Sequence, residues 1–281
     1  MIPLKKYFIF SILLYMQNYV LIVGILYIIF SFFEFQFPVE SGQGISGRIQ
    51  NIVHGITLIV VGGFITIQVY SAFHIIIPDE PRNLGNNTMW FSLWITFLYL
   101  LLTDLIFYWY HRLQHISDTF WQVHELHHTD RTLNVTSSLR SYWIEKPLQT
   151  LLITIPVFYI IGIDNLAVIL FPIISLIWLL FAHANIKLSL GFLTPIICGP
   201  QVHRIHHSLH PKHHNKNFAQ YFPFIDKIFG TYYAPKNHEW VVTGIKHNSG
   251  NDSVLVTFLK PWKIWAGMLY KKIVISSRNL F

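Results

Sequence analysis

The sequence DLIFYWYHRLQHISDTFWQVHELHH, residues 104–128, ends an apolar run in a cluster of histidines. His111 and His115 are four residues apart, so on a helix both imidazoles project from the same face. Three more histidines follow at spacings of three and four residues: His124, His127 and His128. Far downstream, the segment QVHRIHH repeats this H-x-x-H-H pattern in His203, His206 and His207. Clusters of this kind, the first at the end of a membrane-length segment, predict a metal site.

The composition favours an integral membrane protein. The chain of 281 residues is 53% hydrophobic and 12% charged, whereas soluble domains carry about 25% charged residues. The net charge of +7 does not predict nucleic-acid binding, because the basic residues are scattered rather than interleaved with aromatic residues in one stripe. Cys198 is the single cysteine, which argues against a disulfide framework and against a cysteine-based zinc or iron–sulfur site.

Hydrophobic segments predict the fold: an all-α, multi-pass membrane protein with four or five hydrophobic helical segments and a histidine-rich helical cap. The segments are 7–33, 53–77, 89–110, 148–162 and 165–182. The first is too long for the core of a signal peptide and has no clear cleavage site, so we expect no cleavable signal. The last two are short for a full crossing and predict a hairpin, because a span needs about 20 residues. We expect a polar loop over residues 34–50.

The order of these segments predicts one membrane-embedded domain over residues 1–281. It comprises N-terminal spans (1–88), a histidine-rich core (89–235) and a C-terminal tail on the membrane surface (236–281). In this arrangement both histidine clusters lie on the same side of the membrane. Sixteen of the twenty Lys and Arg residues follow residue 110, so the positive-inside rule predicts that this side is cytoplasmic. Lys5 and Lys6 would lie outside, which counts against the model a little.

The number of histidines indicates two metal ions. Eight histidines in three motifs are too many for one four-coordinate zinc, and His183 at the exit of the last segment gives a ninth nitrogen. The predicted ligands are His111, His115, His124, His127, His128, His183, His203, His206 and His207. Asn185 could add an oxygen nearby. The other candidates are expected to be solvated surface residues: His210, His213 and His214.

Asp104 is the predicted catalytic carboxylate. It precedes His111 by seven residues, two helical turns along nearly the same face, so it could orient an imidazole from outside the ligand set. A carboxylate within a span is costly unless it has a use. Gly62 and Gly63, in the second segment, would allow helices to approach closely.

Two other functions fit parts of the pattern. HELHH (124–128) satisfies the zinc-protease signature H-E-x-x-H with Glu125 as base, but that reading leaves His111, His115 and the downstream cluster unexplained. A metal transporter or metal-binding membrane protein would need ligands inside its spans, whereas these histidines gather at one end of the spans.

The three motifs resemble the histidine boxes of the fatty acid hydroxylase/sterol desaturase superfamily. The flanking residues Asp104 and Arg112 agree, and NFAQYFPFIDKIFGTYY (217–233) is similar to the family's segment after the third box. The similarity covers roughly residues 90–235, and SLRSYW (138–143) departs from the usual pattern. The resemblance implies a non-haem enzyme with two Fe ions that uses O2 and an external electron donor to hydroxylate or desaturate a lipid. The boxes leave these two outcomes open, because both begin with removal of hydrogen from an unactivated C–H bond.

Overall fold

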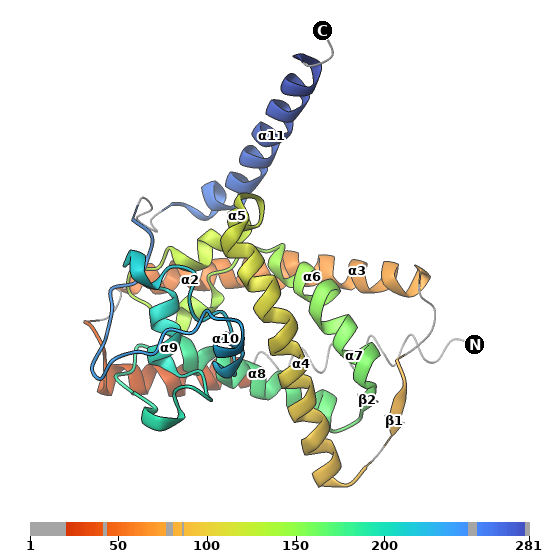
Figure 1. Cartoon of the computed structure of the whole chain (residues 1–281), viewed down its shortest axis with the longest axis vertical. Coiled ribbons are helices and arrows are strands. Elements are labelled where there is room, and N and C mark those ends of the chain that lie inside the picture. Colours follow the sequence, from red (N-terminus) through yellow and green to blue (C-terminus); the bar gives the residue numbers. More distant parts are fainter. Residues whose placement is uncertain (1–20, 42–43, 77–80, 86, 247–251, 279–281) are drawn as a thin grey trace.

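The computed structural model describes residues 21–41, 44–76, 81–85, 87–246 and 252–278. Within these ranges the chain is mostly helical, which confirms the all-α prediction, and its two short strands are β1 (Asn83–Gly85) and β2 (Ile163–Asp164), paired in parallel. Figure 1 shows the helices gathered around α4 (Met89–Ile116), while α11 (Val254–Arg278) projects away from the body.

The N-terminal part contains two long helical runs. The first is the helix Leu21–Gln36, and the part of the predicted segment before residue 21 lies outside the described residues. The second joins α2 (Ile45–Thr57), the π-helical turn η1 (Leu58–Gly62) and α3 (Gly63–Ile76). The predicted loop over 34–50 is therefore wrong at both ends, because residues 34–36 are helical and residues 45–50 belong to α2. Ile45, Ile49 and Ile52 repeat with a helical period and lie exposed, so the apolar stripe begins earlier than expected.

The first histidine pair is part of α4 itself. Thr88 caps this helix by accepting a hydrogen bond from the backbone N–H of Phe91 at 3.3 Å. The helix continues six residues beyond the predicted end at residue 110 and stops at Ile116. The chain then reverses within a residue into α5 (Asp118–His128), which carries the second motif and packs against α4.

The predicted hairpin is a pair of helical runs joined by a tight turn. The first run comprises α6 (Glu145–Gln149), the π-helical turn η3 (Thr150–Thr154) and α7 (Ile155–Ile161), and the second is α8 (Ala167–His183). Gly162 between them has φ +98°, and a Cβ there would lie 2.6 Å from the carbonyl oxygen of Arg82. Asp164, before α8, accepts a hydrogen bond from the N–H of Ala167, the first residue of that helix, at 2.9 Å, so local chemistry fixes the turn.

The remaining elements are short and cover the end of α4. They are the 3-10 turns η2 (Val135–Leu139), η4 (Gly191–Leu193) and η5 (Pro211–His213), and the helices α9 (Pro200–His206) and α10 (Phe224–Ile228). Tyr108 of α4 is fully buried with Phe218 and Ile225 from this region. This packing holds the third histidine motif close to the first.

Two helices in the described part of the chain are long and apolar enough to cross a membrane: Ile45–Phe73 and Met89–Ile116. The helices Leu21–Gln36 and Ala167–His183 are apolar but shorter. Large apolar side chains are exposed along the second of the long runs, Ile45–Phe73, including Ile56, Val60 and Phe64. Exposure of this kind is what contact with lipid requires, and it supports a membrane protein.

Candidate metal centre

All nine predicted ligand histidines lie together at the C-terminal end of α4. They come from α4, α5, the last residue of α8 and α9 with the residue that follows it. The five-histidine group comprises His111, His115, His124, His128 and His206, and the four-histidine group comprises His127, His183, His203 and His207. Within each group, one ring nitrogen from every member lies within 4.8 Å of the others.

The helical period divides each H-x-x-H-H motif between the two groups. Residues four apart share a face, so α5 gives His124 and His128 to the five-histidine group, and the intervening His127 points to the other. The motif on α9 does the reverse, because His203 and His207 join the four-histidine group while His206 joins the five. Each segment therefore contributes to both groups.

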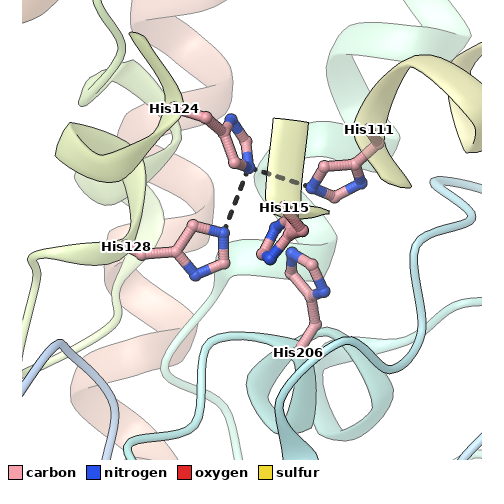
Figure 2. A group of neighbouring side chains, drawn as sticks. All are labelled: His111, His115, His124, His128 and His206. Atoms are coloured by element: carbon pink, nitrogen blue, oxygen red, sulfur yellow. Dashed lines mark hydrogen bonds between the residues drawn. The ribbon is translucent and has the colours of Figure 1, made fainter. Parts of the chain in front are cut away.

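The five-histidine group has the spacing of a coordination shell (Figure 2). The Nε2 atom of His124 lies 3.0 Å from Nε2 of His111 and 3.1 Å from Nε2 of His128. Two nitrogens that each lie about 2.1 Å from one ion, at right angles, are about 3.0 Å apart. The rings of His115 and His206 face this cluster, and their Nε2 atoms are buried without any hydrogen-bond partner. Buried nitrogens in that state require a cation or another partner.

The four-histidine group shows the same spacing. Its successive Nε2 atoms are separated by 3.1 Å from His127 to His183, by 3.0 Å from His183 to His203, and by 3.0 Å from His203 to His207. The two groups adjoin, because the rings of His128 and His207 stack with centroids 4.4 Å apart. Two ions bound here would be neighbours.

Hydrogen bonds on the outer side of the rings determine which nitrogens carry lone pairs. The Nδ1 atom of His127 lies 3.2 Å from the carbonyl oxygen of Arg140, and that of His183 lies 2.8 Å from the carbonyl oxygen of Leu179. A carbonyl only accepts, so both Nδ1 atoms carry the proton and both Nε2 atoms carry a lone pair. The two Nε2 atoms, 3.1 Å apart, therefore face each other with lone pairs. A cation bound by both would remove this repulsion.

The same reasoning applies to the five-histidine group. The Nδ1 atom of His111 donates to the carbonyl oxygen of Phe218 at 2.8 Å, and that of His124 faces the carboxylate oxygen Oε1 of Glu145 at 3.0 Å. Both Nε2 atoms thus present lone pairs to one point. The carboxylate–histidine pair is the usual outer partner of a metal-bound imidazole. The residues present fit a pair of metal ions.

Burial also keeps these imidazoles neutral. It lowers the pKa of His124 and of His206 to about 3, and that of His127 to about 4, from the ordinary value of 6.5. A neutral imidazole can bind a metal ion without first losing a proton. The site is therefore ready for metal at neutral pH.

Asp104 contacts none of the histidines directly, which differs from the orienting role expected for it. Its carboxylate accepts hydrogen bonds from the backbone N–H groups of Gln220, Tyr221 and Phe222, at 2.6, 3.0 and 2.7 Å. The physical reason is distance, because seven residues of helix separate Asp104 from His111 by about 10 Å. Asp104 instead fixes the segment whose carbonyl at Phe218 receives the His111 proton.

Other candidates lie outside both groups. His213 is buried rather than solvated as expected, with Nδ1 2.8 Å from the hydroxyl of Ser208, while His210 and His214 are exposed as predicted. Asn185 is buried and donates to the carbonyl of Glu40. Glu125 forms an ion pair with Lys260 of α11, at 2.6 Å.

Sequence reasoning missed the outer partners of the histidines. Among the outer partners of His111, His124, His127, His183 and His206, Glu145 is the one side chain. The others are main-chain carbonyls, of Phe218, Arg140, Leu179 and Lys216. A carbonyl is present at every residue, so no sequence signal marks it. Glu145 follows an aromatic run and lies 21 positions from its histidine, which leaves no local pattern to identify it.

Comparisons with known proteins find similar sequences over the region that carries the histidines. A family model described as fatty acid hydroxylase matches residues 96–231. The chain is 31% identical to alkylglycerol monooxygenase of Danio rerio over 63% of its length and 39% of the relative's. It is 28% identical to ornithine lipid hydroxylase OlsE of Rhizobium tropici, over 48% of its length and 41% of the relative's. It is 27% identical to Delta(7)-sterol 5(6)-desaturase ERG3B of Gibberella zeae, over 50% of its length and 42% of the relative's.

The matched region contains all nine histidines, from His111 of α4 to His207 after α9. The chain spans about two fifths of the length of these relatives. No solved structure gives a significant match. These three relatives are named as a monooxygenase, a lipid hydroxylase and a sterol desaturase. The histidine motifs, the family match and these relatives fit the fatty acid hydroxylase/sterol desaturase superfamily, which the chain resembles.

Proposed function

We propose that the two histidine groups bind two iron ions and that the protein is an O2-dependent oxidoreductase acting on a lipid C–H bond. The observation that carries this proposal is the pair of histidine groups whose Nε2 lone pairs face one another at 3.0–3.1 Å. When bound, two redox-active ions would supply O2 activation and cleavage of the C–H bond. Imidazole suits iron, zinc and copper alike, so iron is proposed from the family and not from the geometry.

The chain's own residues would hold, orient and shield the ions. The outer hydrogen bonds of His111, His124, His127, His183 and His206 fix the tautomer in which Nε2 is the ligand atom. Eight of the nine histidines are buried, and His115 is the partly exposed one. Substrate would therefore reach the site past His115, beside which the ring of Trp121 lies 5.2 Å away.

The substrate proposed first is an ether lipid of the alkylglycerol type. The relatives named for alkylglycerol, ornithine lipid and sterol differ in headgroup, and all of these compounds are lipids with long unactivated C–H frameworks. We further propose a multi-pass protein with the site facing the cytoplasm and electrons supplied by a separate donor. The basic residues concentrated after residue 110 support this orientation.

The position of Glu125 argues against a zinc protease. The H-E-x-x-H reading needs this carboxylate near an ion held by His124 and His128. Its side chain instead pairs with Lys260 on α11, whereas His124 turns its Nε2 toward His111. Glu125 therefore lies on a different side of α5 from the metal centre.

The first test is the number of iron ions per chain after anaerobic reconstitution in detergent. Wild type should hold two, and His127→Ala should hold one, because its group is left with three histidines. His115→Ala combined with His206→Ala should lose the other ion. His210→Ala is the matched control, because this histidine is exposed and outside both groups. One tightly held zinc that survives in all variants would contradict the proposal.

The second test is activity of the iron-loaded protein with a reductant and 18O2. Alkylglycerol, ornithine lipid and sterol are supplied separately in mixed micelles. Mass spectrometry should show one 18O atom in a hydroxylated product, or the loss of two hydrogens in a desaturated one. Two bound irons without any change in these lipids would contradict the assigned activity and leave the metal site intact.

A further inference from the structure

We propose that α11 is a membrane-surface helix whose exposed apolar stripe lies in the headgroup region of an anionic bilayer. It deepens the proposed function, on which it rests, by placing α5 and its histidine motif beside the lipid that is to be modified. Four observations on α11 carry the inference: an exposed apolar stripe, an edge packed on the protein, charged residues that are all basic, and a position at the end of a candidate span.

The exposed stripe follows the helical period. Leu255, Leu259, Trp262, Ala266 and Leu269 recur at intervals of four and three residues, and all are exposed. Leu255 is 68% exposed and Leu269 is 61% exposed. Removing large apolar side chains from water lowers the free energy, so a stripe this long predicts a partner that covers it.

The other edge of α11 is attached to the protein. The rings of Phe258 and Trp262 stack on Trp143, and the hydroxyl of Tyr142 donates to the carbonyl of Phe258 at 2.7 Å. Lys260 pairs with Glu125 of α5. These contacts hold the helix in place, and Trp262 lies where the packed edge meets the exposed apolar stripe.

The charge of α11 complements an anionic surface. Residues 254–278 contain five basic residues and no acidic residue: Lys260, Lys263, Lys271, Lys272 and Arg278. The helix has 25 residues but is not among the two described helices that are apolar enough to cross a membrane. A basic helix with an apolar stripe and interfacial tryptophans lies in the plane of the headgroups.

The N-terminal end of α11 lies beside one end of a candidate membrane span. Gln50 donates a hydrogen bond to the carbonyl of Asp252, just before the helix begins. Gln50 is near the start of the candidate span Ile45–Phe73. In Figure 1, α11 leaves the body beside α5 and points away from it, oblique to α2 and α3. A basic helix attached at one end of a candidate span is placed where the bilayer surface would be.

The test uses the full chain in nanodiscs of phosphatidylcholine with phosphatidylglycerol. Leu255→Cys and Leu269→Cys are made in a Cys198→Ala background and labelled with the fluorophore NBD. Asn237→Cys, at an exposed loop position, is the matched control. Quenching is measured with a lipid that carries a nitroxide near its headgroup and, separately, with aqueous iodide. We expect the nitroxide lipid to remove most of the fluorescence at residues 255 and 269, and iodide to remove it at residue 237.

Two results would overturn the proposal. Labels on α11 that respond to iodide and not to the nitroxide lipid would show a helix in water, and labels protected from both quenchers would show a protein partner such as a second copy of the chain. Unchanged quenching in nanodiscs without phosphatidylglycerol would refute the role of charge. Iron content is measured on the same variants, so a failed metal proposal would be seen separately from a failed membrane proposal.

Discussion

Replacing Glu145 by alanine should weaken the binding of one iron ion and leave the other in place. Its Oε1 atom lies 3.0 Å from Nδ1 of His124, and both side chains are buried. The substitution leaves a buried N–H without an acceptor, at a cost of about 1–3 kcal/mol. Loss of such an outer partner weakens metal binding by about 10–100-fold, which corresponds to about 1.4–2.7 kcal/mol. His124 belongs to the five-histidine group, so that ion should be the weaker one.

The assay is competition between the protein and an Fe(II) chelator under anaerobic conditions. As chelator is added, Glu145→Ala should pass through a stage with one iron per chain at a concentration where wild type still holds two. Glu125→Ala is the matched control, because it removes the same charge from a residue next to His124 that is paired instead with Lys260. Equal weakening of both ions, no weakening at all, or the same loss in Glu125→Ala would refute the argument from the hydrogen bond.

Three further predictions test the packing, the loop anchor and the protonation of the site. Gly62→Ala should destabilise the protein by about 1–3 kcal/mol, because a Cβ there would lie 2.5 Å from the carbonyl oxygen of Trp143. Gly63→Ala, where no atom lies within 4 Å, should show no such loss in the same thermal unfolding assay. Asp104→Ala should cost about 3 kcal/mol or more, because three backbone N–H groups lose a charged acceptor; wild-type thermal stability and iron retention would contradict this. The metal-free protein should lose stability on acidification. In the unfolded chain each imidazole binds a proton below about pH 6.5, whereas in the folded protein burial lowers the pKa of three imidazoles to about 3 to 4: those of His124, His127 and His206. Each should contribute a loss of about 1.4 kcal/mol by about pH 5.5, and a thermal midpoint that rises on acidification would refute it.

Helix positions were largely predictable because hydrophobicity is a local property of the chain. The apolar runs identified α4, α8 and the central part of α2–α3, and polar residues with Gly162 identified the turn between α7 and α8. The start of α2 was missed, since glycines and polar residues at positions 41–50 suggest a loop while the isoleucines between them keep a helical period. Of the two glycines expected to allow close approach, only Gly62 lies against another segment.

The gathering of the nine histidines was predictable for a different reason. Metal sites select one residue type, and helical spacing of that type is visible in a sequence. The outer hydrogen bonds were not predictable, because most are to main-chain carbonyls brought close by tertiary packing. Asp104 illustrates the limit, since its sequence position gave the right helix face but not its partner, the backbone of residues 220–222.

The division of each motif between the two groups links metal binding to folding. Neither α5 nor α9 can form a complete group alone, because each gives a pair to one group and a single histidine to the other. Both ions would therefore join α5 to α9, and the lone pairs of His127 and His183 would face each other without compensation if the metal were removed. Binding to the folded state alone stabilises it in proportion to the logarithm of metal concentration over Kd. The same ions that would carry out the oxidation should thus also hold the third histidine motif against the second.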